Sequence, residues 1–334
     1  MTVRLKIFGN TDWADGDILT GSDQSETITK AATEPWYEVI QNEGSTVQRG
    51  LIAFGTSGSI WQTRNELTTD SGGSWVSQGY YDEAALAVAN GSGGISQKTG
   101  GNTGLKYTLT NGSPWFDAAV DAGSYGTAGV RDMALNGSVG IMTGNANGGP
   151  GFGWYSHDTG STWAQISGPG VITHGVTMSS SSVGYLCDNS QNIWKTTDGG
   201  VNWTDTADNL SVNMAKAVSS GTDVVYWTDG DSMVLQEYVN STNTVNTIAT
   251  VGGASSLTNP VIATNGNVYA VSTGTDSQVT LLKYDGSKVF TKIVTVKSPS
   301  FVSDNTFVNN LIHHDNVLYL NLSGFIVKIE LGDK

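Results

Sequence analysis

Short runs of alternating apolar and polar residues follow one another along most of the chain, separated by turns rich in Gly, Ser, Thr and Asn. A side-chain period of two over such short runs predicts half-buried β-strands. The clearest four predicted strands cover residues 174–178, 183–188, 192–197 and 202–206. Comparable groups lie at 130–135, 139–144, 152–157 and 162–166, at 215–218, 224–228, 233–239 and 245–250, and at 261–264, 268–272, 280–284 and 290–296. The pattern therefore predicts an all-β protein built from repeated four-stranded units.

The turn before the last strand of these units carries a repeated motif. It reads Ser156-His157-Asp158-Thr159-Gly160-Ser161-Thr162-Trp163, and it recurs over residues 196–203 and, more loosely, over 68–75. We expect the Asp to accept hydrogen bonds from turn amides, the Gly to adopt a positive φ, and the Trp to bury its ring. Because the motif repeats at equivalent turns, these roles are structural. The residues expected to fill them are Asp70, Trp75, Asp158, Gly160, Trp163, Asp198, Gly200 and Trp203.

The spacing of the motif predicts how the units assemble. Trp75, Trp115, Trp163 and Trp203 are 40, 48 and 40 residues apart, and a period of about 40 to 45 residues is typical of propeller blades. Extending this phase to positions 36, 248 and 290 gives seven blades of four antiparallel strands. The last unit, residues 307–331, shows only three strand-like runs. We therefore expect the strand around Trp36 to complete it and to close the ring.

The motif S/T-x-D-x-G-x-x-W resembles the Asp-box, or BNR, repeat of sialidase-type β-propellers. The resemblance implies a propeller fold, but proteins with this repeat include glycoside hydrolases, assembly factors and adhesive proteins. Fold alone does not choose among such functions. Function must therefore be sought in other features of the chain.

Residues 1–35 differ in pattern from the propeller predicted over 36–334. The segment from Asp12 to Thr27 resembles a leader, W-x-x-G-D-x-L-T-A-x-D-L-N-D-T-F, found near the N-termini of many tailed-phage virion proteins. It departs from that leader at Gly21, and at Gln24 and Ser25. The simpler alternative is a loosely packed arm. The resemblance implies an anchor to other virion proteins, and the matching residues include Trp13, Gly16, Asp17, Leu19 and Thr20.

Composition and net charge argue against some classes of binding partner. A formal net charge of −14 argues against binding to nucleic acid or to an anionic membrane surface. No apolar run approaches the roughly 18 residues of a membrane span, and we find no signal peptide. The single cysteine, Cys187, excludes an intrachain disulfide and is expected to be a buried apolar residue. Nothing in the sequence predicts a cofactor.

Catalytic chemistry has little support in the sequence. A sialidase needs three arginines around one carboxylate, and outside the arm the chain offers Arg49, Arg64 and Arg131 alone. Paired carboxylates could still meet at a channel mouth and hydrolyse a glycoside, although each is more simply a solvated turn residue. Neighbouring His313 and His314 point to opposite faces of a strand, so we expect no metal site. The carboxylates concerned are Asp82, Glu83, Asp117, Asp121, Asp132 and Asp223.

Aromatic residues and a Gly-rich insert offer a candidate ligand surface instead. Trp115, Tyr80 and Tyr81 could stack on sugar rings, as could Phe116, and Asn147 lies in the insert 145–151. We therefore expect a non-enzymatic structural protein of a tailed-virus particle, located in the virion and multimeric there. Its arm would bind other virion proteins and its propeller a protein or a host-surface glycan or receptor. The alternatives are a sialidase-like or other glycoside hydrolase and an assembly-factor propeller.

Overall fold

The computed structural model describes most of the chain from residue 36 onward. The described residues are 36–42, 51–55, 60–62, 66–69, 76–77, 84–98, 105–120, 130–145, 151–169, 175–209, 214, 216–221, 223–228, 233–251, 256–263, 266–273, 278–284, 286, 290–297, 308–322 and 325–330. The arm predicted over residues 1–35 lies outside them.

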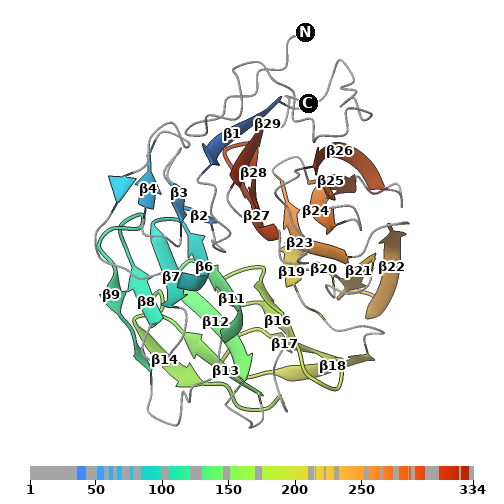
Figure 1. Ribbon diagram of the computed structural model, residues 1–334. Coiled ribbons are helices and arrows are strands. Elements are labelled where there is room, and N and C mark those ends of the chain that lie inside the picture. The colour runs from blue at the N-terminus through green and yellow to red at the C-terminus, as the bar shows by residue number, and fades with distance from the viewer. Residues whose placement is uncertain are drawn as a thin grey trace.

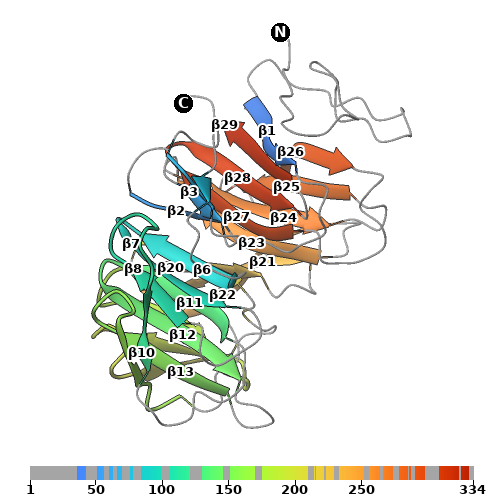
Figure 2. The ribbon, with the colours of Figure 1, turned by 60° about the vertical axis from the view of Figure 1, so that its left-hand side comes forward.

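The protein is an all-β propeller, as its sequence pattern predicts. Figure 1 looks along the axis of the ring, and small antiparallel sheets follow one another around it in chain order. Figure 2, turned by 60°, shows the same sheets from the side as stacked, twisted blades. In most of these sheets the chain enters at the strand nearest the axis and leaves at the outer edge. The alternation of apolar and polar residues suits this arrangement, because each blade packs both faces against its neighbours.

The chain forms the sheets largely one after another. The first sheets contain β2 (Leu51–Ala53), β3 (Ile60–Gln62), β4 (Glu66–Thr68) and β5 (Val76–Ser77), then β6 (Ala84–Asn90), β7 (Gly93–Lys98), β8 (Leu105–Thr108) and β9 (Phe116–Asp117). The next contain β10 (Ala119–Val120), β11 (Val130–Asn136), β12 (Val139–Asn145), β13 (Gly151–Ser156) and β14 (Thr162–Gln165), then β15 (Val176–Met178), β16 (Gly184–Cys187), β17 (Asn192–Thr196) and β18 (Thr204–Asn209). Then come β19 (Lys216–Ser220), β20 (Val224–Thr228), β21 (Val234–Val239) and β22 (Thr244–Thr250), and β23 (Ser256–Ile262), β24 (Val268–Thr273), β25 (Gln278–Tyr284) and β26 (Phe290–Lys297). The last sheet joins β1 (Trp36–Asn42) to β27 (Val308–His314), β28 (Val317–Leu322) and β29 (Phe325–Glu330).

The first and last described strands pair with each other. β1 runs antiparallel to β29, with Trp36 opposite Glu330 and Asn42 opposite Phe325, and one irregularity between Val39 and Gln41. The sequence predicted this pairing from the missing fourth strand of the last unit. Because β1 covers the edge of β29, the ends of the propeller chain are held by main-chain hydrogen bonds.

One strand was not predicted. β10 lies parallel to β14, with Ala119 opposite Thr162 and Val120 opposite Trp163. The Ala119 amide donates to the Ser161 carbonyl oxygen at 2.7 Å. The segment that leaves one sheet thus covers the outer edge of the next before entering it at β11. Only two residues take part, so alternating polarity could not reveal the strand.

The hydrophobic core lies between adjacent sheets rather than in one central mass. Tyr185 and Cys187 on β16 pack with Trp227 and Tyr238 of the following sheet, and all four are almost wholly buried. The Tyr185 and Tyr238 rings meet edge to face, with centroids 5.9 Å apart. Burial raises the pKa of the Cys187 thiol to about 12, so this cysteine is the buried apolar residue that the sequence predicts.

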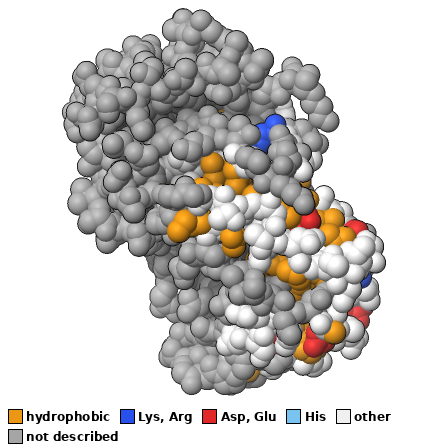
Figure 3. Space-filling view, turned by 90° about the vertical axis from the view of Figure 1, so that its right-hand side faces the viewer, with side chains coloured by type: hydrophobic (Ala, Val, Ile, Leu, Met, Phe, Trp, Pro, Cys, Tyr) orange, Lys and Arg blue, Asp and Glu red, His pale blue; other side chains and the backbone are white. Residues whose placement is uncertain are grey.

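The chain carries few charges. Figure 3, seen from the right-hand side of Figure 1, shows hydrophobic side chains spread over the coloured part, with few acidic or basic ones among them. Only 14% of all residues are charged, about half the usual share for a soluble domain. Within the described ranges, no helix is long and apolar enough to cross a membrane.

Candidate functional sites

The repeated turns are built by their own side chains. In the first, Asp158 Oδ1 accepts a hydrogen bond from the Thr162 amide at 2.8 Å, and Oδ2 accepts one from the Thr162 hydroxyl at 2.6 Å. Ser156 Oγ donates to Asp158 and accepts from the Gly160 amide, each at 2.8 Å. The Asp158 and Ser156 side chains therefore bond within the eight-residue turn.

The second turn repeats this geometry. Asp198 accepts from the Asn202 amide at 2.9 Å and from its side-chain amide at 2.7 Å, while Thr196 takes the place of Ser156. The hydrogen bond from the Asn202 amide is the main cause that holds the Asp198 pKa below its ordinary value. At Asp158, burial acts to raise the pKa, but the hydrogen bonds from Thr162 outweigh it and the net shift is also downward. Both carboxylates thus serve to stabilise their turns.

Glycine and tryptophan join each turn to the preceding blade. Gly160 and Gly200 have φ of 85° and 95°, a region that costs other residues energy. A Cβ at Gly160 would lie 2.8 Å from Ile95 Cγ1 of the preceding sheet. The indole N–H of Trp163 donates to the Gly160 carbonyl at 2.8 Å, and Trp203 bonds Gly200 at 2.9 Å. The turn therefore caps an interface between blades.

A third described turn follows the same plan with a different residue at the Asp position. Trp115 lies five residues after Thr110, which stands where the other turns have Asp, so the spacing is the same as in those turns. Thr108 takes the position of Ser156 and accepts a hydrogen bond from the Thr110 amide at 3.3 Å. Trp115 is only 3% exposed. It therefore offers no stacking face, and its place in the predicted ligand surface is wrong.

The other residues of that surface lie outside the described part of the chain, as do some of the structural and anchor residues. These are Tyr80, Tyr81 and Asn147, the turn residues Asp70 and Trp75, and the arm residues Trp13, Gly16, Asp17, Leu19 and Thr20. Their predicted roles stay predictions.

An exposed aromatic surface lies next to Trp115. Phe116 on the outer strand β9 is 45% exposed, and its ring centroid is 5.5 Å from that of Tyr107 on β8. Leu109, just after β8, is 51% exposed. In the adjacent register pair of the same two strands, Lys106 forms an ion pair with Asp117, which lies on the opposite face of the sheet. Trp115, at the end of the turn, is buried, whereas Phe116 and Asp117, the two residues of the outer strand β9, are both exposed.

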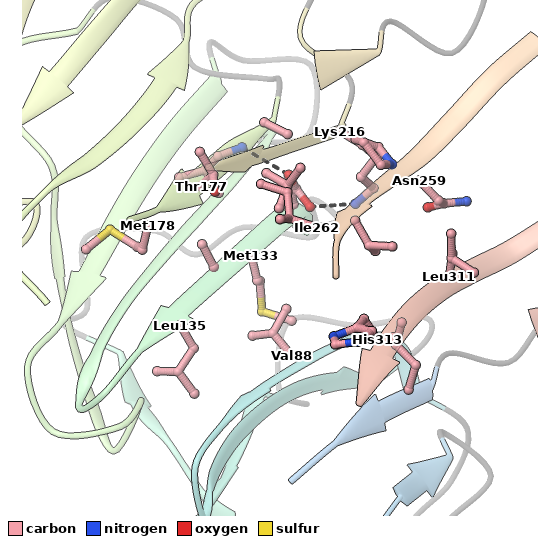
Figure 4. A pocket seen from close by; sticks show the side chains of 18 of the residues that line it. Val88, Met133, Leu135, Thr177, Met178, Lys216, Asn259, Ile262, Leu311 and His313 are labelled. Carbon is pink, nitrogen blue, oxygen red and sulfur yellow. Dashed lines mark hydrogen bonds and ion pairs between the residues drawn. The ribbon is translucent and has the colours of Figure 1, made fainter. Parts of the chain in front are cut away.

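A second candidate site is the hollow at the axis of the ring. It has a volume of about 450 Å³, and every sheet contributes lining residues from its innermost strand. Most are apolar, among them Val88, Met133 and Leu311. Figure 4 looks into it, with Lys216 in the upper part of the view, His313 in the lower part and Met133 beside the space between them. We call this hollow the central channel.

The polar residues of the central channel lie far apart in sequence. Asp132 Oδ1 forms an ion pair with Lys216, and Oδ2 accepts from the Val176 amide at 3.0 Å. Asp132 is 8% exposed at its side chain and Lys216 32%. His313 also lines the channel, and its Nε2 is buried with no hydrogen-bond partner among the residues described. Burial, followed by the charge of His314, lowers the His313 pKa, against the opposing effect of Asp315.

The structure separates the carboxylates that the sequence proposed as a catalytic pair. Asp117 lies on the outer strand β9, while Asp132 lines the central channel. Asp223 accepts from the Ser241 amide at 2.7 Å in a turn beside β20. The other three, Asp82, Glu83 and Asp121, lie outside the described residues. Among the described residues, no group of three His, Cys, Asp or Glu side chains could hold a metal ion.

Comparison with known proteins shows the fold. No protein-family model and no curated protein matches the chain. The GH74 xyloglucanase from Xanthomonas campestris is similar, with a TM-score of 0.63 and 11% identity over 89% of this chain and 54% of that one. YCF48 from Cyanidioschyzon merolae has a TM-score of 0.59 at 13% identity over 88% and 98%. A chain of the Mitotic Checkpoint Complex has 0.60 at 13% over 95% and 99%. Identities this low show a shared propeller architecture and nothing about activity.

Proposed function

We propose that this protein is a non-enzymatic recognition module of a tailed-virus particle. In this proposal a seven-bladed propeller, carried on an N-terminal arm, presents its blade edges to a protein or a host-surface glycan. The count of seven blades rests on the seven repeat positions in the sequence. The order of strands in the sheets and the β1–β29 pairing support it.

The observation that carries the recognition role is the aromatic surface at the edge of one blade. The Phe116 ring lies against Tyr107 on a solvent-facing strand, and the Lys106–Asp117 ion pair of the same two strands points to the opposite face. Exposed aromatic rings are common contacts for sugars and for protein partners, since the ring supplies rigid apolar area. The surface is accessible without any rearrangement of the blade.

The structural roles of the described carboxylates favour binding over hydrolysis as the function. Glycoside hydrolysis needs two carboxyl groups facing one bond. Of the described residues that line the central channel, Asp132 alone is a carboxylate, and Val176 and Lys216 occupy its two oxygens. The Asp158 and Asp198 carboxylates serve the turns. The chemistry of these groups supports a structural role for each.

A glycan array tests the recognition role. We expect Phe116→Ser to weaken binding of the protein to its best array ligands about three- to tenfold, the value of one lost aromatic contact. Val76→Ser is the matched control, since Val76 is 61% exposed on the outer strand of a different blade. Equal binding by Phe116→Ser and the parent would remove the aromatic surface from the proposal.

Co-sedimentation tests the anchoring role. Full-length protein and protein lacking residues 1–30 would be mixed with particles that lack the protein, after circular dichroism has shown both to be folded. We expect only the full-length protein to sediment with the particles, because an extended arm can pair with a neighbour's sheet edge. Equal sedimentation would place the attachment surface on the propeller.

A further inference from the structure

We propose that the central channel is a binding site for a small amphipathic carboxylate, with the carboxylate at Lys216 and the apolar body beside Met133 and Val88. This site shares no residue with the aromatic surface, so the inference goes beyond the proposed function and does not rest on it.

The dimensions and the lining suit a small ligand. The volume of about 450 Å³ lies within the roughly 300–1,000 Å³ typical of small-molecule sites. Such sites are mainly apolar with a few placed polar groups. The central channel has this composition, since apolar side chains such as Val88, Met133 and Leu311 surround the hollow, while Lys216 and Asn259 also line it.

The charged group in the wall sets which end of a ligand binds there. Asp132 is nearly buried, and its two oxygens accept from Lys216 and from the Val176 amide. It thus holds the lysine in place, and both of its oxygens are engaged although it also lines the hollow. Lys216 is more exposed, and an ammonium has three donors, of which Asp132 engages one. A ligand head that reaches Lys216 therefore meets the N–H donors of the ammonium.

A donor-only group selects a ligand head that only accepts hydrogen bonds. Bonds from an ammonium to a carboxylate are roughly twice as strong as those between neutral groups. His313, on another part of the wall, has a lowered pKa through burial and is neutral at pH 7. Lys216 is then the single cation among the described lining residues, so the carboxylate has one favoured position and the apolar body lies away from it.

Calorimetric titration of the full chain with three probes of equal length tests this inference. The probes are octanoate, 1-octanol and octylammonium. We expect octanoate to bind with one molecule per chain, at least fivefold more tightly than octanol, and octylammonium to bind more weakly than either. Octanol binding as tightly as octanoate would overturn the carboxylate assignment, and the absence of binding by all three would overturn the site.

Variants locate the binding. Lys216→Met should remove the preference for octanoate over octanol, and Val88→Phe should weaken both by filling the hollow. Because Lys216→Met leaves the Asp132 carboxylate without its cation, the pair Asp132→Asn with Lys216→Met provides a neutral wall with the same expected loss. Lys195→Met is the control, since Lys195 binds Asn240 at 3.0 Å and does not line the channel. A preserved octanoate preference in both Lys216 variants would refute the proposal.

Discussion

Replacing Trp203 with alanine tests how the repeated turns stabilise the propeller. The Trp203 side chain is 8% exposed and packs with Ile141, Met178 and Leu186 in the core between two sheets. Its indole N–H also donates to the Gly200 carbonyl at 2.9 Å. A large-to-small change in such a core costs about 3–5 kcal/mol of unfolding free energy.

The expected shift in melting temperature follows from the size of the protein. With about 2 cal/mol/K of unfolding entropy per residue, a chain of 334 residues has about 0.7 kcal/mol/K in total. A loss of 3–5 kcal/mol therefore corresponds to a decrease of about 4–7 °C. Trp203→Phe keeps most of the ring but leaves the Gly200 carbonyl unpaired, so its cost is about 1–3 kcal/mol.

Thermal and urea unfolding followed by far-ultraviolet circular dichroism is the suitable assay. Tryptophan fluorescence is less suitable, because ten tryptophans contribute to it. Phe116→Ala serves as the control, since an exposed aromatic removed from a strand should change the unfolding free energy by no more than about 0.5 kcal/mol. If Trp203→Ala melts with the parent, the packing role assigned to the repeated tryptophan is wrong.

Two further predictions concern ring closure and pH. Deleting residues 1–42 removes β1 and exposes β29, so we expect aggregation or a lower melting temperature, whereas deletion of 1–30 should leave the melting temperature unchanged; a stable, monomeric 43–334 protein would contradict the closure. The His313 pKa in the folded protein lies below its ordinary 6.5. Its contribution to the free energy of unfolding is therefore present above pH 6.5 and is lost as pH falls from 6.5 toward the folded pKa. The pKa values of Asp158 and Asp198 lie below 3.8, so their contribution to the free energy of unfolding is lost only as pH falls below that value. Melting temperatures between pH 3 and 8 should therefore decrease in two stages, and His313→Leu should abolish the first; a parent-like first stage in that variant would exclude His313 as its cause.

The sequence alone determined the local structure of the blades. In each repeated turn the Asp side chain bonds groups at most four residues away, as Asp158 bonds Thr162. Such a turn is specified by a contiguous segment, and its regular recurrence predicts the propeller. The β1–β29 pairing was also predictable, because the last unit lacked a strand and the segment around Trp36 lacked a unit.

Only the tertiary structure decided which distant side chains meet. Asp132 and Lys216 are 84 residues apart and lie on different blades, and no local pattern connects them. Trp115 and Phe116 are both aromatic, so the sequence pattern does not distinguish them. In the structure the first is buried and the second is exposed. Strand periodicity and turn bonding act within a segment. The central channel and the aromatic surface depend instead on how segments far apart in the chain are brought together around the ring.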